Sequence, residues 1–372
     1  MAICAPSLVL SRPTLDACGL AALGERWRLL EAEAEPAIFQ TWTWVGCNAA
    51  ERFPDPLLIE AHDAQGLVAI ALWNRRRSWF AGDSLWLHES GDPMLDAAFT
   101  EHNDPLLARR APDGLLTLMF QAALQARDGR RPRLMLSGVG PATRQAALQA
   151  GAMVIPGPDR IAPRVEFASL PPETAYVDQL SRNTRQQLRR SNRAYANHGA
   201  LRIERAATIA QAEAFLGALM VLHTATWRSR GKPGAFATDP VRRFHQSLIR
   251  RGAPEEIELL RISAGGTVVG YLYNLVCGNR ACAYQSGFDY PGAGPHAKPG
   301  LTCHHLAIEM HRARGGISYD FLGGADRYKR SLATAEGTLH WLSIAPPRHP
   351  AAMLARLRCL IQRATVPKTA PD

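Results

Sequence analysis

The sequence has no long uninterrupted hydrophobic run. No stretch approaches the roughly 20 apolar residues that a membrane-spanning helix needs. Met1–Asp16 also lacks the basic segment and apolar core that mark a signal peptide. We therefore expect a cytoplasmic protein without a transmembrane segment.

Cysteine is scarce and irregularly spaced. The 372 residues include 7 cysteines, an odd number, and no two of them form a Cys-x-x-Cys pair. Such spacing disfavours a disulfide framework and a structural zinc site, and it fits a reducing compartment. Since no other set of ligand-type residues stands out, we expect no metal site.

The overall composition is that of an ordinary globular protein. Hydrophobic residues make up 47% of the chain and charged residues 20%, and the length is sufficient for two hydrophobic cores. The net charge of +10 comes mostly from arginine. A basic surface attracts nucleic acid, membranes or a small anion such as coenzyme A, so charge alone does not select one of them.

Two hairpin-like segments resemble one another across the halves of the chain. Leu57–Asn74 reads LLIEAHDAQGLVAIALWN, and Ile257–Asn274 reads IELLRISAGGTVVGYLYN. Each has a turn-type cluster between two apolar runs of strand length. Helical patterns precede both segments, and a helix and a further strand follow each. We therefore predict two similar lobes.

A proline-rich segment separates the predicted lobes. Pro156–Thr174 contains one short strand-like run, Arg164–Phe167, and its composition is typical of a crossover. A last amphipathic helical pattern covers Ala351–Ala364. We predict an N-terminal lobe, a linker, a C-terminal domain and a tail over residues 1–155, 156–175, 176–346 and 347–372.

The element order of the second lobe resembles the GNAT fold of N-acyltransferases. It runs from a strand at Leu201–Arg205 through two helices, three strands, a helix, a strand and a short helix to a strand at Gly337–Ile344. We therefore expect an α/β protein of two GNAT-like lobes, each a mixed, largely antiparallel sheet flanked by helices. The resemblance implies that two neighbouring strands diverge, so that their backbone holds the pantetheine arm of coenzyme A and a helix N-terminus receives its pyrophosphate.

An arginine-rich helix begins the second lobe. Asn183–Ala196 reads NTRQQLRRSNRAYA, and four arginines spaced by three or four residues share one face: Arg182, Arg185, Arg189 and Arg193. The face is either solvated or a binding ridge for phosphates. Under the second reading Arg185 and Arg189 contact the acyl donor.

A glycine- and proline-containing loop follows the next helix. Leu222–Phe236 reads LHTATWRSRGKPGAF, which is non-helical at its end. Trp227 and Phe236 either line the acceptor pocket or fill the core.

The segment Tyr284–Leu306 has the highest density of chemically useful residues. Lys298 and Gly300 flank a proline at the first turn of a helix, where backbone N–H groups can face an anion. This Lys-Pro-Gly element stands where the GNAT pyrophosphate loop, R/Q-x-x-G-x-G/A, is expected, and that loop is absent.

A histidine and a glutamate on the same helix could act as a general base. His305 and Glu309 are four residues apart and share a face. The alternative is a hydrogen-bonded structural histidine. Asp289, in the preceding loop, is the second candidate base, and Tyr284 is a candidate proton donor.

The segment Tyr319–Ala333, YDFLGGADRYKRSLA, combines a strand, two glycines and a short helix. Gly323 and Gly324 permit close approach of the backbone to a ligand. Tyr328 and Lys329 follow, and a lysine here can neutralise an oxyanion or a phosphate. Asp320 faces either the cleft or the outside.

Taken together, four segments resemble the CelD-like (BioF2-like) branch of the GNAT superfamily: NTRQQLRRSNRAY, LHTATWRSRGKPGAF, YQSGFDY with KPGLTCHHLAIE, and YDFLGGADRYKRSLA. The resemblance covers about residues 176–345 well and the first lobe loosely. It implies an acyltransferase associated with exopolysaccharide or cellulose biosynthesis. The last segment is also similar to the aromatic–lysine motif of Fem-type transferases, which assigns Lys329 to the reaction centre.

These observations lead to one main functional hypothesis and two alternatives. The main one is transfer of an acyl group, acetyl first, from acyl-CoA to an amine of a small molecule or saccharide precursor. Lys329 stabilises negative charge, His305 with Glu309 is the base, and Tyr284 or Tyr328 protonates the thiolate. The alternatives are a Fem-like transferase that uses aminoacyl-tRNA, and a non-catalytic lobe that binds a nucleotide sugar or scaffolds polysaccharide assembly.

Overall fold

The chain forms two compact units. The computed structural model describes residues 6–126, 128, 130–169, 175–324 and 326–365. Unit 1 comprises Met1–Asp96, Thr100–Asp159 and His340–Asp372, and unit 2 comprises Ala97–Phe99 and Arg160–Leu339. The chain therefore passes between the units within two long strands, β7 (Met153–Glu166) and β13 (Ala335–Ala345). Part of the predicted linker, residues 170–174, and the end of the predicted tail, residues 366–372, lie outside the described residues.

Unit 1 has a sheet with the strand order β1-β2-β3-β4-β6-β13. Neighbouring strands are antiparallel except β4 and β6, which are parallel. The strands that begin in this unit are β1 (Ser7–Ser11), β2 (Pro56–Asp63), β3 (Gly66–Arg76), β4 (Ser84–Leu87), a short β5 (Leu106–Leu107) paired with β3, and β6 (Arg133–Val139).

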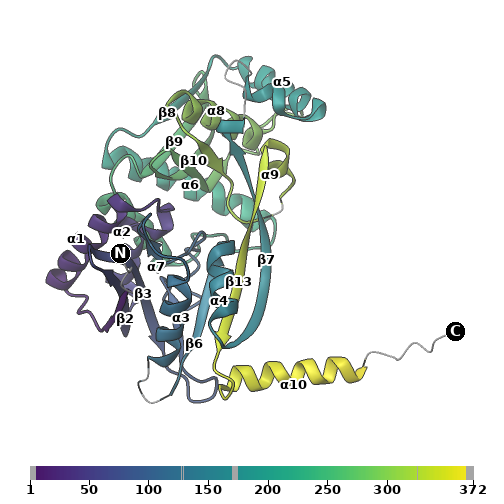
Figure 1. The fold of residues 1–372 in the computed structure, drawn as a ribbon. Coiled ribbons are helices and arrows are strands. Elements are labelled where there is room, and N and C mark those ends of the chain that lie inside the picture. The colour runs from purple at the N-terminus through teal and green to yellow at the C-terminus, as the bar shows by residue number, and fades with distance from the viewer. Residues whose placement is uncertain (1–5, 127, 129, 170–174, 325, 366–372) are drawn as a thin grey trace. The chain divides into compact units, whose positions relative to one another are not determined.

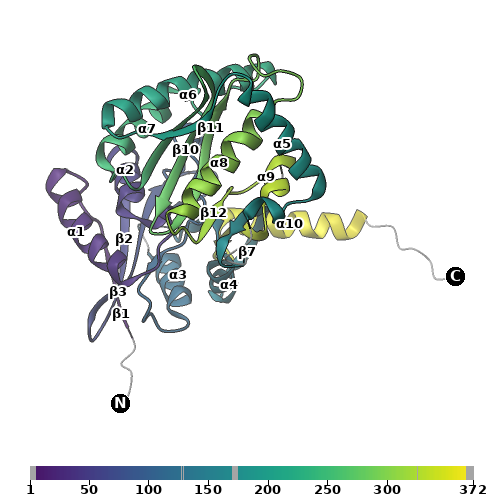
Figure 2. The same cartoon turned by 90° about the horizontal axis from the view of Figure 1, so that it is seen from above.

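Helices accompany this sheet, as Figures 1 and 2 show. They are α1 (Ala17–Glu33), α2 (Trp42–Arg52), α3 (Leu115–Gln125), α4 (Pro141–Gln149) and α10 (Pro350–Thr365). The apolar faces of the first four helices and of the strands form one continuous core, which includes the fully buried Trp27, Trp73 and Phe120.

The paired strands of unit 2 have the order β7-β12-β11-β10-β9-β8. Its strands are β8 (Leu201–Arg205), β9 (Ile257–Ala264), β10 (Thr267–Cys277), β11 (Arg280–Phe288) and β12 (Ser318–Asp320), besides the end of β7. All neighbours are antiparallel except β11 and β12. The two predicted hairpins are confirmed as β2–β3 and β9–β10.

Helices cover both faces of the sheet in unit 2. In Figures 1 and 2, α6 (Ile209–Ser229) and α7 (Asp239–Arg251) lie on one face, and α5 (Arg182–Ala196) and α8 (Pro299–Ala313) lie on the other. The short α9 (Arg327–Leu332) packs on α8. The predicted α/β class, with largely antiparallel mixed sheets and flanking helices, is confirmed.

One helix of unit 2 has the length and composition of a membrane span. Among the described residues this applies to α6 alone, with 21 residues. Phe215, Leu216 and Leu219 on this helix are buried, and the helix packs against β9, β10 and β11. One face of α6 therefore packs on the sheet of unit 2.

The parallel pair β11–β12 diverges after three residues. Arg280–Cys282 pair with Ser318–Asp320, and the pairing with β12 ends there. From Ala283 to Phe288, β11 continues beside β10 alone among the described strands. One edge of β11 is thus left open to the space next to α9, as the GNAT-like element order predicts.

A strained turn redirects the chain immediately after β12. Leu322 has a φ of +60°, which is uncommon for a residue with a side chain. The Asp320 carboxylate stabilises the turn by accepting a hydrogen bond from the Leu322 amide at 2.6 Å. Beyond β12 the chain stays beside β7, because the Phe321 and Gly324 amides donate to the Pro163 and Ile161 carbonyls.

Candidate functional site

Unit 2 contains a cavity of about 430 Å³ at the divergence of β11 and β12. β11 contributes Tyr284, Gln285 and Ser286 to its lining, and α6 contributes His223 and Trp227. The chain after β12 supplies Gly323 and the residues Asp326–Lys329, and α8 supplies His304. The cavity therefore combines an open strand edge with titratable side chains from two helices.

Lys329 lies at the wall formed after β12. Its ammonium group donates a hydrogen bond to the Gly323 carbonyl at 3.1 Å. A Cβ atom at Gly324, where φ is +136°, would lie only 3.2 Å from the Lys329 Nζ. The two glycines thus allow the backbone to fold closely around the ammonium group, which fixes a positive charge beside the cavity.

Tyr328 lines the cavity next to a histidine. Its ring stacks on His304 with a centroid distance of 5.5 Å and an interplanar angle of 19°. Burial raises the pKa of the Tyr328 hydroxyl, with a further contribution from Asp326. Tyr328 therefore keeps its proton at neutral pH and can donate it.

His304 begins a chain of buried hydrogen bonds. Its Nδ1 lies 3.2 Å from the Tyr319 hydroxyl, which donates to the Asn274 Oδ1 at 3.2 Å. The Asn274 Nδ2 donates to the Glu258 Oε2 at 3.0 Å. Arg314 completes the chain by donating to the other Glu258 oxygen at 2.9 Å.

This series of hydrogen bonds determines the tautomer of His304. The Glu258 carboxylate only accepts, so the Asn274 amide group must face it and the Asn274 oxygen must face Tyr319. Because the single Tyr319 proton then goes to Asn274, the His304 Nδ1 has to be the donor to Tyr319. The His304 Nε2 consequently carries a lone pair, and this buried atom has no hydrogen-bond partner among the described residues.

The surroundings keep His304 uncharged. Burial, aided by the positive charge of Lys329, lowers its pKa to about 3. The ring is 2% exposed. The wall of the cavity thus contains a neutral imidazole close to a fixed cation.

His223 has a different environment from His304. Its Nδ1 donates to the Ser286 carbonyl at 2.9 Å, and its Nε2 accepts from the Ala235 amide at 3.0 Å. With both nitrogens engaged, His223 joins α6 to β11 and to the following loop. Its role is to shape the cavity wall.

Aromatic rings form the rest of the wall. The Tyr284 ring packs on Phe99 with centroids 4.8 Å apart. Trp227 lies beneath two cations, with the Arg230 Cζ 5.7 Å and the Lys232 Nζ 5.6 Å from its ring centroid. This side of the cavity is apolar inside and positively charged at its rim.

The part of the chain that holds this cavity is similar to a known protein family. Residues 182–330 match the model of the acetyltransferase (GNAT) domain family. Over these residues, unit 2 is similar to a GNAT-type acetyltransferase domain. The matched range contains α5, the diverging strands and Lys329, so the cavity lies within the domain.

Solved structures share the fold of the chain. FemX aligns with a TM-score of 0.61 and 9% identity, covering 93% of this chain and 99% of that one. The C-terminal domain of a putative lysylphosphatidylglycerol synthetase from Agrobacterium fabrum aligns with a TM-score of 0.56 and 12% identity, covering 92% of this chain and 96% of that one. L-PGS from Bacillus licheniformis aligns with a TM-score of 0.53 and 10% identity, covering 91% of this chain and 96% of that one. No curated protein matches the chain by sequence.

Several residues singled out in the sequence meet at this cavity of unit 2. Those that line it are Tyr284, Trp227, Gly323, Tyr328 and Lys329. Gly324 and Asp320 support them from the adjoining turn. Phe236 is 2% exposed and packs on the rings of His223 and His245, outside the lining.

The pair His305 and Glu309 lies on a different face of α8 from His304. The His305 Nε2 is 4.0 Å from the Glu309 carboxylate, and its ring stacks on Tyr176 at 6.3 Å. Burial lowers the pKa of His305. Asp289 accepts a hydrogen bond from the Gly292 amide at 3.0 Å and stabilises a turn. None of the three lines the cavity.

The residues predicted to bind the donor phosphates form two groups apart from this cavity. The Lys298 amide donates to the Ser191 hydroxyl of α5 at 2.8 Å, and Gly300 lies against the Phe288 ring. Arg185 donates to the Asp178 and Leu180 carbonyls, both at 2.8 Å. A separate open cavity of about 630 Å³ is lined by Asp178, Arg182, Arg185, Gln186 and Arg189.

The sequence analysis missed His304, Tyr319 and Asn274. One signal was present, because Asn274 is a polar residue near the end of an apolar strand run and is 1% exposed. Such a buried amide requires partners.

No group of three or more histidine, cysteine or carboxylate side chains that could hold a metal ion occurs in the part of the chain that the structure describes.

Proposed function

We propose that the GNAT-type domain transfers an acyl group, acetyl first, from acyl-CoA to the amine of a small molecule or saccharide precursor. The observation that carries this proposal is the cavity at the divergence of β11 and β12. There Lys329, Tyr328 and His304 line one cavity beside an open strand edge, and the His304 Nε2 has no hydrogen-bond partner among the described residues. Acyl transfer needs these three functions: charge stabilisation, a proton donor and a hydrogen-bond acceptor for the amine.

The donor thioester lies along β11 in this proposal. The edge from Ala283 to Phe288 offers backbone N–H and C=O groups to an extended ligand, as a strand would. The thioester carbonyl then points toward the Lys329 ammonium group. A fixed cation in a partly dry cavity stabilises the oxyanion that develops during attack.

The acceptor amine lies against His304. The Nε2 lone pair accepts a hydrogen bond from an amine N–H and so directs the nitrogen lone pair toward the carbonyl carbon. The nearby positive charge of Lys329 disfavours the ammonium form of the acceptor. Both effects favour the neutral, nucleophilic amine.

The reaction proceeds by a balanced exchange of bonds and protons. The nitrogen forms a bond to the carbonyl carbon, and the carbon–sulfur bond breaks. The Tyr328 hydroxyl gives its proton to the leaving thiolate and regains a proton from the acylated nitrogen. The products are an amide and free coenzyme A.

We place the partner of the amine at His304, in preference to His305 with Glu309 or to Asp289, because His304 lines the cavity.

The wider assignment rests on the resemblance to the CelD-like branch. It comprises a role in exopolysaccharide or cellulose biosynthesis, a cytoplasmic location and catalysis by the C-terminal domain predicted over residues 176–346. Lys298, Gly300, Arg185 and Arg189 remain candidates for the donor phosphates. Because the cavity beside Arg185 and Arg189 is open and lined by three arginines, it fits the distal, anionic part of a donor.

A second candidate keeps the fold and changes the donor to an aminoacyl ester on tRNA. The arginine face of α5 favours it, since a row of guanidinium groups suits a phosphate backbone. The chemistry in the cavity would be the same, with a ribose oxygen as the leaving group in place of sulfur.

The experiment that tests the proposal compares donors with the purified full chain. Thiol release from acetyl-CoA and longer acyl-CoA molecules is measured with a panel of amines and amino sugars, in parallel with transfer from charged tRNA. Amine-dependent thiol release supports the proposal. Transfer from charged tRNA alone would assign the second candidate, and stabilisation by nucleotide sugars without any transfer would assign a binding role.

A further inference from the structure

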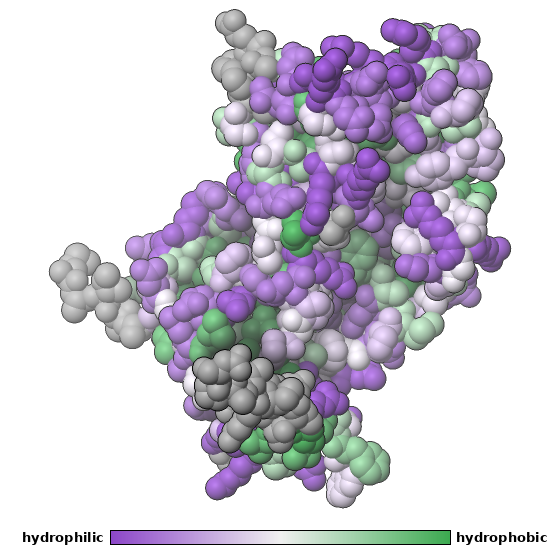
Figure 3. Space-filling model, turned by 90° about the vertical axis from the view of Figure 1, so that its right-hand side faces the viewer, coloured by the Kyte–Doolittle hydropathy of each residue, from purple (hydrophilic) through white to green (hydrophobic). Residues whose placement is uncertain are grey.

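Unit 1 has an exposed apolar surface built from α10 and the loop after β3. Five side chains of α10 are between 49% and 63% exposed: Met353, Leu354, Leu357, Leu360 and Ile361. In the loop, Trp79 is 80% and Phe80 is 90% exposed. Figure 3 shows hydrophobic side chains in the lower part of that view, where α10 lies. We call these seven residues the apolar surface.

The side chains of α10 are arranged as in a helix that lies at a membrane interface. At about 100° per residue, the five apolar positions occupy roughly one third of the helix circumference. Arg356 and Arg358, both exposed, follow on the two sides of this stripe. No aspartate or glutamate occurs between Pro350 and Thr365. A narrow apolar stripe flanked by arginine is typical of interfacial helices.

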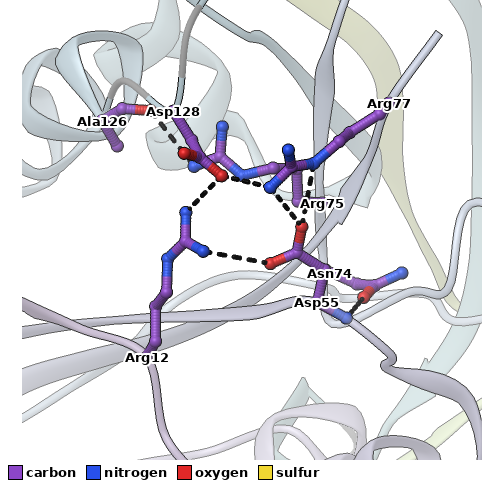
Figure 4. Close-up of polar contacts among 7 residues, drawn as sticks. All are labelled: Arg12, Asp55, Asn74, Arg75, Arg77, Ala126 and Asp128. Carbon is purple, nitrogen blue, oxygen red and sulfur yellow. Dashed lines mark hydrogen bonds and ion pairs between the residues drawn. The ribbon is translucent and has the colours of Figure 1, made fainter.

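The loop that carries the exposed Trp79 and Phe80 is stabilised by ion pairs at its start. Figure 4 shows Arg77 and Arg12 paired with Asp55 and Asp128 at the start of the loop. Arg130 donates to the Trp79 carbonyl at 3.4 Å, and its guanidinium lies 5.2 Å from the centre of the Trp79 ring. The exposure of these rings therefore belongs to a braced loop.

A histidine joins this loop to α10. The His349 Nε2 donates to the Asp83 carbonyl at 3.0 Å, and a Cβ at Gly82 would lie 2.5 Å from the same nitrogen. The start of α10 and the end of the loop are thus packed together. The helix and the loop therefore adjoin at the start of α10.

A basic cavity of about 570 Å³ lies between them. It is lined by Arg130, Arg131 and Arg348, together with Gly82, His349 and prolines, and no carboxylate of a described residue lines it. Guanidinium groups bind phosphate strongly, and burial of the aromatic and aliphatic side chains in lipid is favourable. The surface therefore combines an apolar part with a site for an anionic group.

We propose that the apolar surface docks unit 1 on an anionic lipid bilayer. Trp79, Phe80 and the stripe of α10 enter the interfacial layer, and the arginines contact headgroup phosphates. A second copy of the chain fits less well, because a symmetric contact would oppose the same arginines with no carboxylate in the surface to offset them. Docking would place the enzyme beside membrane-bound acceptors or products.

Co-sedimentation of the full chain with vesicles tests this inference. We expect at least about tenfold stronger binding to vesicles with phosphatidylglycerol than to pure phosphatidylcholine, and a loss of binding in about 1 M salt. Leu357→Glu with Leu360→Glu should weaken binding about tenfold or more. Leu118→Glu is the matched control, because Leu118 is exposed on α3 of the same unit and lies outside the apolar surface.

A second readout follows the loop directly. Brominated lipid should quench part of the tryptophan fluorescence in the unsubstituted protein, and Trp79→Phe should remove that part while the helical circular dichroism is unchanged. Equal binding to both vesicle types, no binding, or quenching that persists in Trp79→Phe would overturn the inference. Self-association that Leu357→Glu with Leu360→Glu abolishes in the absence of lipid would assign the surface to a second copy.

Discussion

At the scale of single residues, the chemistry of the cavity depends on which nitrogen of His304 carries a proton. The chain through Tyr319 and Asn274 to Glu258 leaves Nε2 free as an acceptor. Of these hydrogen-bonded residues, His304 alone lines the cavity, so Tyr319, Asn274 and Glu258 act by positioning it. Their contribution can be separated from that of the cavity wall by substitution.

Removal of the Tyr319 hydroxyl should affect turnover more than binding. In Tyr319→Phe the His304 Nδ1 loses its acceptor and the tautomer is no longer fixed, so kcat should fall about tenfold or more, ~1.4 kcal/mol in the barrier, with little change in KM. The free energy of unfolding should fall by about 1 kcal/mol. Steady-state kinetics and urea unfolding measure the two. Tyr271→Phe, at another buried tyrosine of the same sheet, should leave kcat unchanged.

The sequence predicted some residues of this site and missed others for a geometric reason. Motif spacing identified Lys329 and Tyr328 because they follow a glycine pair after a strand. On α8, however, His304 and His305 are adjacent, and one step along a helix turns a side chain by about 100°. Sequence spacing favoured His305 through its partner Glu309, whereas only the packing against Tyr319 and Phe321 reveals the position of His304.

At the scale of elements, the cavity exists because β11 extends beyond its parallel neighbour. Three paired residues are followed by six without a partner in β12 among the described strands. On one face of this open segment, α6 approaches β11 very closely at Gly287. A Cβ atom there would lie 2.4 Å from the Leu219 carbonyl oxygen.

Gly287→Ala should therefore destabilise the domain. The added methyl group forces α6 away from β11, with an expected cost of about 1–3 kcal/mol in the free energy of unfolding, and it displaces His223 at the cavity wall. Gly266→Ala serves as the control, because a methyl group at Gly266 would have no atom of the described residues within 4 Å beyond its chain neighbours. Denaturant unfolding compares the two variants. Equal stability of both would contradict the close approach of α6.

Local elements were predictable where turn residues and periodicity agree. The hairpins β2–β3 and β9–β10 follow from turn clusters between apolar runs. By contrast, the segment Met153–Glu166 is a long strand although it contains three prolines. Proline lacks the donor but keeps the carbonyl, and here the Pro163 and Ile161 carbonyls accept from Phe321 and Gly324. These partners are distant in sequence, so the pattern of β7 alone could not show the pairing.

At the scale of the whole molecule, each unit buries a histidine that remains neutral. Burial lowers the pKa of His88 in unit 1 and of His304 in unit 2 to about 3, from an ordinary 6.5. Burial, with the charge of Asp96, raises the pKa of Glu89 in unit 1 from 4.5 to about 8. These opposite shifts contribute in opposite directions to the dependence of stability on pH.

The free energy of unfolding should have its maximum near the ordinary histidine pKa of 6.5. As pH falls below this value, the unfolded chain binds protons at both histidines that the folded chain does not, and stability decreases. Between pH 6.5 and 8 the unfolded chain has already released the Glu89 proton, whereas the folded chain still retains it, so stability decreases as pH rises. Urea unfolding across this range measures the curve, with slopes of up to about 1.4 kcal/mol per pH unit for each group.

Glu89→Gln separates the two effects. This substitution should abolish the decline of stability between pH 6.5 and 8, while stability should still decrease as pH falls below 6.5. A decline that persists in the variant would show that another group is responsible.

The passage of the chain between the units could not be predicted from local patterns. The C-terminal strand β13 pairs with β6, about 200 residues earlier, through residues such as His340 and Ile344. The sequence analysis predicted two lobes in series, because a repeat is visible locally and a long-range strand pairing is not. The match to the acetyltransferase (GNAT) domain family over residues 182–330 concerns unit 2, where the proposed chemistry lies.

The central claim is that the cavity beside Lys329 carries out acyl transfer. The most direct measurement is kcat/KM for amine-dependent thiol release in Lys329→Ala, compared with Arg330→Ala on the same helix. Arg330 is exposed, pairs with Glu336 and does not line the cavity. We predict a loss of about 100-fold or more for Lys329→Ala at an unchanged melting temperature, and none for Arg330→Ala. Equal activity of the two variants, or loss of activity only through unfolding of Lys329→Ala, would contradict the account.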